Sequence, residues 1–132
     1  MNLTDYIIHG SGETKQINFS DSALINLEEI LNYGFNNNNN IDFFLNKLSS
    51  IKSNWTSLNL LDSEWGFWDD GELAEKGVTG HWFYLLGEPD IDIYICVETK
   101  KLFIENEIMP HYPIVELSVD EFISILEQWK EM

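Results

Sequence analysis

The alternation of hydrophobic and polar positions predicts two short strands and two helices in the first half of the chain. Residues 5–9 (DYIIH) and 16–19 (QINF) have the composition of strands, and the intervening GSGET is typical of a turn. Apolar residues at helical spacing predict a helix over 21–33, with Ser20 or Asp21 as its cap. Residues 36–40 are all asparagine and predict a flexible loop. A second helix is predicted over about 41–53, with a buried stripe of Ile41, Phe44, Leu45, Leu48 and Ile51.

The second half of the chain predicts a sheet. Residues 55–79 show no period and are predicted to be irregular, whereas 81–86 and 91–98 predict strands on either side of the turn GEPD. In the second of these, isoleucines and Val97 alternate with Asp92, Tyr94 and Cys96, which predicts a half-buried antiparallel strand. After a turn at 99–100, further strands are predicted at 101–105 and, beyond Pro110 and Pro113, at 114–117.

The last segment predicts an amphipathic helix with a well-defined start. Ser118 and Glu121 have the spacing of a capping box, and Leu117 and Phe122 have that of a hydrophobic staple. The buried face is predicted to hold Phe122, Ile125, Leu126 and Trp129. Because strands and helices do not alternate along the chain, the predicted class is α+β, an antiparallel sheet with helices packed on one side.

Length and composition predict a single domain over residues 1–132. The chain is 44% hydrophobic and 14% aromatic, enough to build a core. No apolar run approaches the roughly 20 residues that cross a bilayer, and the first residues do not resemble a signal peptide. Cys96 is the one cysteine, so no intramolecular disulfide can form. These observations favour a cytoplasmic location.

The net charge of the chain limits the classes of molecule that it is expected to bind. Seven lysines and no arginine stand against 23 Asp and Glu, for a formal net charge of −16. Such a chain repels phosphates, which argues against nucleic acids, anionic membranes and nucleotide enzymes as functional classes. An acidic field attracts a basic partner and speeds the encounter with it. The alternative is that the acidity only keeps the protein soluble.

One stretch, SEWGFWDDGEL at 63–73, combines aromatic and acidic residues and suggests three chemistries. A metal site is disfavoured because the three histidines are far apart and the carboxylates lack the spacing of a calcium loop. Catalytic cysteines tend to lie at helix N-termini or near basic groups, whereas Cys96 lies within a strand amid acidic charge and is predicted to be a structural thiol. A pair of carboxylates with tryptophans stacked on a sugar stays open as a hydrolase site. No catalytic residue, metal or cofactor is assigned.

The third chemistry is a docking surface for protein, and it is the one we favour. Aromatic residues anchor interfaces, and surrounding carboxylates complement a basic partner. The predicted partner-binding residues are Glu64, Trp65, Phe67, Trp68, Asp69, Asp70, Glu72 and Glu75. Acids near 88–92 or 105–107 are expected to join them. The alternative is that Trp65 and Trp68 fill the core while the acids face water.

The C-terminal third suggests a family. The segments DIDIYICVETKKLFIENE and YPIVELSVDEFISILEQWKEM resemble the ending of small bacterial immunity proteins, the antidotes of contact-dependent inhibition and other polymorphic toxin systems. The resemblance implies a cytoplasmic inhibitor, not an enzyme, that occludes the C-terminal domain of a cognate toxin, often a basic nuclease. The alternatives are an SMI1/KNR4-like scaffold or regulatory module and a small carboxylate-dependent hydrolase. The sequence does not indicate the oligomeric state.

Overall fold

The computed structural model describes residues 5–53, 65–68, 80–88, 91–96, 99–109 and 111–132. The strands are β1 (Tyr6–His9), β2 (Gln16–Phe19), β3 (Trp65–Trp68), β4 (Gly80–Glu88), β5 (Ile91–Cys96), β6 (Lys101–Asn106) and β7 (Val115–Ser118). The α-helices are α1 (Ile25–Tyr33), α2 (Asn38–Ser53) and α5 (Val119–Glu131). Short 3₁₀ turns lie at Gly12–Thr14 and Ser22–Leu24. Within these residues, no helix is both long and apolar enough to cross a bilayer.

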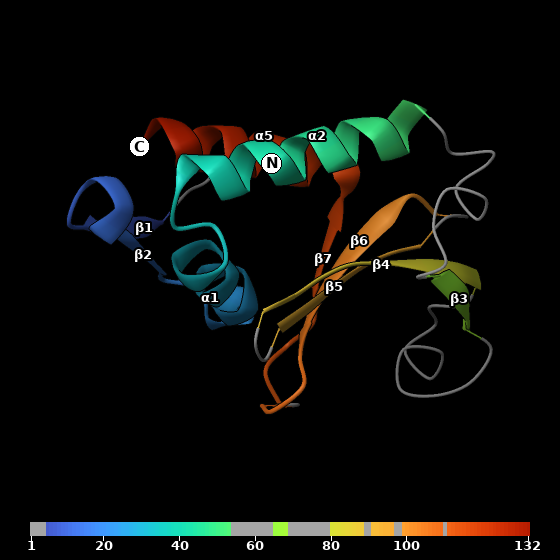
Figure 1. Ribbon diagram of the computed structural model, residues 1–132. Helices are drawn as coiled ribbons and strands as arrows, with labels where there is room; N and C mark the ends of the chain where they lie inside the picture. Colours follow the sequence, from blue (N-terminus) through green and yellow to red (C-terminus); the bar gives the residue numbers. More distant parts are fainter. Residues whose placement is uncertain (1–4, 54–64, 69–79, 89–90, 97–98, 110) are drawn as a thin grey trace.

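The predicted α+β class is confirmed. Strands β3 to β7 form one antiparallel sheet in sequence order, and β1 pairs with β2 in a separate hairpin. Figure 1 shows α2 and α5 lying side by side above the large sheet, with α1 between the hairpin and the sheet. The predicted strands at 5–9, 16–19, 81–86, 101–105 and 114–117 all form, with ends shifted by at most a few residues.

The prediction of a half-buried strand at 91–98 is wrong in its burial. β5 is the central strand of the sheet, and it is buried on both faces. Its isoleucines pack against the helices, while Cys96 on the opposite face is 0% exposed and Asp92 only 5%. Alternating polarity along a strand reports the chemistry of its two faces. It does not report whether both faces are covered.

The core lies between the helices and one face of the sheet. The predicted buried face of α5 is confirmed, with Phe122, Ile125, Leu126 and Trp129 all fully buried. Phe122 meets Phe35 and Phe44 in an aromatic cluster whose ring centroids lie 5.1–6.2 Å apart. Tilted and edge-on rings at these distances add specific packing to the burial of apolar area.

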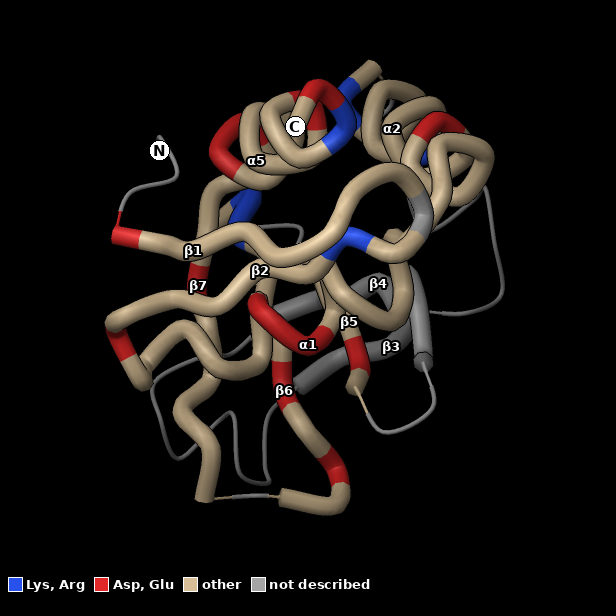
Figure 2. Tube along the Cα trace, turned by 90° about the vertical axis from the view of Figure 1, so that its left-hand side faces the viewer, with Lys and Arg blue, Asp and Glu red and all other residues tan. Residues whose placement is uncertain are grey.

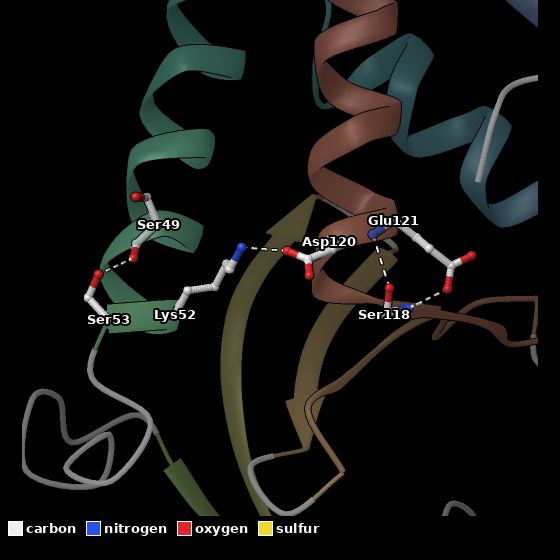
Figure 3. Close-up of polar contacts among 6 residues, drawn as sticks. All are labelled: Ser49, Lys52, Ser53, Ser118, Asp120 and Glu121. Atoms are coloured by element: carbon white, nitrogen blue, oxygen red, sulfur yellow. Dashed lines mark hydrogen bonds and ion pairs between the residues drawn. The ribbon is translucent and has the colours of Figure 1, made fainter.

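The start of α5 has the predicted capping box. The Ser118 hydroxyl accepts a hydrogen bond from the Glu121 N–H at 3.0 Å, and the Glu121 carboxylate accepts from the Ser118 N–H at 3.1 Å (Figure 3). The staple residues Leu117 and Phe122 both belong to the core. An ion pair of 2.5 Å between Lys52 of α2 and Asp120 links the two helices at this end (Figure 3).

The asparagine run is not the predicted loop. α2 begins at Asn38, three residues before the predicted start, so three of the five asparagines are helical. The side chain of Asn37 accepts a hydrogen bond from the N–H of Asn40 at 2.9 Å, which is the geometry of an N-cap. An amide side chain that replaces a missing helical partner explains why a polar run can open a helix.

The hairpin is fixed to α1 through side chains that bind the backbone of β2. The N–H of Ile17 donates to the Asn32 side-chain oxygen at 2.8 Å, and the Asn32 amide donates back to the Ile17 carbonyl at 2.9 Å. Glu28 accepts from the N–H of Phe19 at 2.8 Å. Side chains of α1 therefore supply the hydrogen-bond partners for the edge of β2 that faces away from β1. Asp21, one of the two caps predicted for the helix over 21–33, accepts from the N–H of Ala23 at 2.9 Å and so caps the 3₁₀ turn that precedes α1.

Candidate protein-binding surface

The predicted aromatic and acidic segment is only partly described. Glu64, Asp69, Asp70, Glu72 and Glu75 lie outside the described residues, so their assignment stays a prediction. Trp65, Phe67 and Trp68 form β3, which corrects the prediction that 55–79 is irregular throughout.

The backbone of β3 occupies one edge of the large sheet. It pairs antiparallel with β4, Trp65 opposite Phe83 and Trp68 opposite Gly80. The side chains of β3 and β4 are outside the described part of the structure. Whether the tryptophans anchor a partner or fill the core therefore stays open.

The second predicted group of acids is described in part, and the sheet brings Asp92 and Glu105 together. The register places Asp92 of β5 directly opposite Glu105 of β6, and Glu88 of β4 opposite Ile91. Asn106, the last residue of β6, donates a hydrogen bond to Glu29 of α1, and Glu107 follows Asn106 in the chain. Both glutamates therefore lie at the same end of the sheet. We call the group Glu29, Asp92, Glu105 and Glu107 the acidic end. Figure 2 shows the acidic positions of α1, β5 and β6 below the helices α2 and α5.

The acidic end and β3 lie at different places along the sheet. From Phe83, the partner of Trp65, to Glu88 is five residues of strand, about 17 Å at the usual rise. β3 and the acidic end are thus separated along β4. A partner of ordinary interface size could span both, but each must be tested separately.

The loop after β6 is held in shape at the acidic end. The side-chain oxygen of Asn106 accepts from the N–H groups of Ile108 at 3.0 Å and Met109 at 2.8 Å, and its amide donates to Glu29 at 3.3 Å. Farther along, the Asn26 amide donates to the Pro113 carbonyl at 3.0 Å. Asn26 and Glu29, on one face of α1, therefore hold the loop by hydrogen bonds.

This loop presents apolar surface beside the carboxylates. Ile108 is 64% exposed although the two N–H groups around it are fixed by Asn106. The rings of His111 and Tyr112 contact edge to face at 4.8 Å between centroids. Exposed apolar residues on a preorganised loop with an acidic rim are typical of protein interfaces.

Four of the described lysines have partners away from the acidic end. Three of them are paired with carboxylates in the ion pairs Lys52–Asp120, Lys101–Glu116 and Lys130–Asp42. The ammonium of Lys15 is turned inward and bonds the carbonyl of Trp129. Lys47 and Lys100 also take part in interactions. The long-range field of the surface is therefore set by carboxylates.

Two of the ion pairs shift the pKa of their lysines upward. The hydrogen bond to Glu116 raises the pKa of Lys101 above its ordinary 10.5, and the hydrogen bond to Asp42 does the same for the pKa of Lys130. Both lysines stay charged, and paired, at neutral pH. Neither is an acid or base poised for catalysis.

Other chemistry has little support within the described ranges. There, no three His, Cys, Asp or Glu side chains converge as metal ligands would, and the Cys96 thiol is buried. Comparison with known families, characterised proteins and solved structures found no match for this chain.

The residues that shape the acidic end were not predicted from the sequence. In the sequence, no motif or hydrophobic periodicity singles out Asn26, Asn106 or Ile108. Asn106 directly follows a predicted strand, a position where asparagine commonly bonds the backbone two residues on. That feature could have indicated an ordered loop.

Proposed function

We propose that the protein is an immunity protein that binds a cognate, basic toxin domain and blocks it without chemistry of its own. The observation that supports this is the acidic end beside the anchored loop, on which the apolar side chain of Ile108 is exposed. The resemblance of the C-terminal third to immunity proteins agrees with it. The proposed site of action is the cytoplasm.

The mechanism is electrostatic and steric. The net charge of −16 attracts a basic domain and raises the association rate, an effect that salt screens. Glu105 and Glu107 of the acidic end pair with Lys or Arg of the partner, whereas Asp92 opposite Glu105 is buried and acts only through its charge. Ile108 then enters an apolar pocket of the partner, where anchors contribute most of the affinity. If the toxin is a nuclease, the inhibitor covers the surface that its nucleic acid uses.

The first experiment is a protection assay. The C-terminal domain of the protein encoded immediately upstream is expressed with and without this chain, and growth is scored. We expect death without the chain and rescue with it. The absence of toxicity, or toxicity without rescue, would contradict the proposal.

A matched pair of variants then tests the surface. Glu105→Gln with Glu107→Gln and Ile108→Ala removes two charges and one exposed apolar side chain from the acidic end. Glu127→Gln with Glu131→Gln and Phe43→Ala makes the same changes on exposed positions of α5 and α2. We expect the first variant to bind the toxin domain at least about tenfold more weakly, which is about 1.4 kcal/mol.

We expect the control variant to bind within about twofold of the unmodified chain, since it keeps the local surface. Equal losses in both variants would show that only total charge matters. The β3 segment is tested by Trp68→Ala with Asp69→Asn and Asp70→Asn. If that variant keeps its fold and its full inhibition, the sequence-predicted site is wrong and the acidic end stands alone.

A further inference from the structure

The two strands of the hairpin differ in how they are attached to the rest of the protein. Figure 1 shows the hairpin at the left of the molecule, beside α1. On β2, Ile17 is 0% exposed, and its N–H and carbonyl both bond to the side chain of Asn32. The N–H of Phe19 donates to Glu28 at 2.8 Å. Both contacts come from α1, so β2 is fixed to a helix by hydrogen bonds and by a buried side chain.

β1 has a much weaker attachment. Its residues Tyr6, Ile7 and His9 are exposed, and the half-buried Ile8 is the one that packs against the core. Among the described strands, β1 pairs only with β2. The place of β1 in the fold therefore depends on its hydrogen bonds to β2 and on a single apolar contact.

The register of the hairpin divides the amides of β2 into two sets. Both polar groups of Ile17 bond to Asn32, so they point away from β1. Hydrogen-bonded and non-hydrogen-bonded pairs alternate along an antiparallel ladder. The N–H groups of Gln16 and Asn18 therefore bond to β1, whereas those of Ile17 and Phe19 bond to side chains of α1. Neighbouring amides of one strand are thus held by different elements.

We infer that β1 is a displaceable strand, which opens from β2 while β2 remains on α1. Gly10 follows β1 with a φ of +76°, and its conformational freedom provides a hinge at this point. After the turn, the ammonium of Lys15 bonds to the Trp129 carbonyl of α5 and holds the start of β2 in place. Opening of β1 unpairs the backbone of Gln16 and Asn18, and it exposes a short sheet edge with which an extended chain can pair.

The contacts of the two strands favour this order of opening. Release of β1 exposes one half-buried side chain and the backbone hydrogen bonds of a four-residue strand. Release of β2 would in addition expose Ile17 and break its bonds to Asn32. Segments with few buried apolar contacts and exposed backbone hydrogen bonds open at the lowest free energy.

The test is amide hydrogen exchange of the full chain at neutral pH, followed by NMR, with each rate expressed as a protection factor. We expect the protection factors of Gln16 and Asn18 to be at least about tenfold lower than those of Ile17 and Phe19, which alternate with them in one strand. Equal protection along β2 would mean that the hairpin opens as one unit or stays closed, and it would overturn the inference. Lower protection at Ile17 and Phe19 would overturn it as well.

Two variants of β1 separate the opening of this strand from a general loss of stability. Ile8→Ala removes the half-buried side chain, so we expect the protection of Gln16 and Asn18 to fall at least about tenfold. The two amides of β2 that bond to α1 should stay within about twofold of the unmodified chain. Ile7→Ala changes the exposed face of β1 and should leave all four amides within about twofold. An equal fall of all four in Ile8→Ala would refute a separate opening of β1.

Discussion

The hydrogen bonds between Asn32 and Ile17 allow a sharp test of how the hairpin is held. Ile17 is 0% exposed, and both of its backbone polar groups bond to this one side chain, at 2.8 and 2.9 Å. Asn32→Ala removes both partners and leaves a buried N–H and a buried carbonyl unpaired. Each orphaned group costs about 1–3 kcal/mol, so for the two groups we expect a loss of about 2–6 kcal/mol in the free energy of unfolding.

Such a loss is large against the 5–15 kcal/mol that typically stabilises a domain of this size. Urea denaturation followed by circular dichroism measures it, and the dependence on urea should not change because the same surface is exposed on unfolding. Asn32→Asp keeps the acceptor but loses the donor, so its cost should be at least that of one bond. The control is Asn18→Ala, the neighbouring and exposed position of β2, which should change stability by no more than about 0.5 kcal/mol.

The reasoning fails if Asn32→Ala costs no more than Asn18→Ala. That result would mean that water reaches Ile17 once the amide is removed, and that the apparent burial of its backbone does not persist in solution. A loss confined to the hairpin, with α2 and α5 intact by amide exchange, would instead show that the hairpin unfolds as a separate unit.

Three further predictions concern the helix starts. Ser118→Ala breaks the capping box and should cost about 1 kcal/mol in urea denaturation, and an unchanged midpoint would contradict the role of the cap. Asn37→Ala should cost about as much and should speed amide exchange at Asn40, and unchanged exchange there would show that the run needs no cap. The hydrogen bond from the Ser118 N–H lowers the pKa of Glu121 below 4.5. The stabilisation of the fold by the ionised Glu121 carboxylate is therefore present above the unfolded pKa and is lost as pH falls through the folded pKa. Glu121→Gln should therefore flatten the loss of stability below about pH 4.5 in acid titration, and an unchanged acid limb would refute this.

The elements that the sequence predicted well are those determined by neighbouring residues. The helix after Ser118 needs only a capping box, a staple and four apolar residues at helical spacing, all within one segment. The hairpin strands and the helix after Asp21 depend on equally local patterns. For these elements the structure shifts only the ends.

The predictions that failed concern features that depend on contacts between residues distant in the sequence, or on a side chain that can serve in more than one kind of structure. Whether β5 is covered on one face or both depends on its central position in the sheet. The asparagine run was expected to be a loop because it is polar throughout. That expectation overlooked that the side chain of Asn37 can cap a helix. The acidic end could not be placed at all, because Asp92 and Glu105 become neighbours only through the register of β5 and β6.

The positions of the lysines explain how an acidic chain can be both stable and attractive to a basic partner. Lys52 and Lys130 neutralise carboxylates where α2 and α5 pack together, and Lys101 pairs with Glu116 across β6 and β7. Exposed pairs of this kind add little stability individually, but they remove repulsion between elements that must lie close. None of these three pairs involves the acidic end, so the field there is not reduced by them. Carboxylates grouped at one end of the sheet would orient a basic partner as well as attract it, as the proposed inhibition requires.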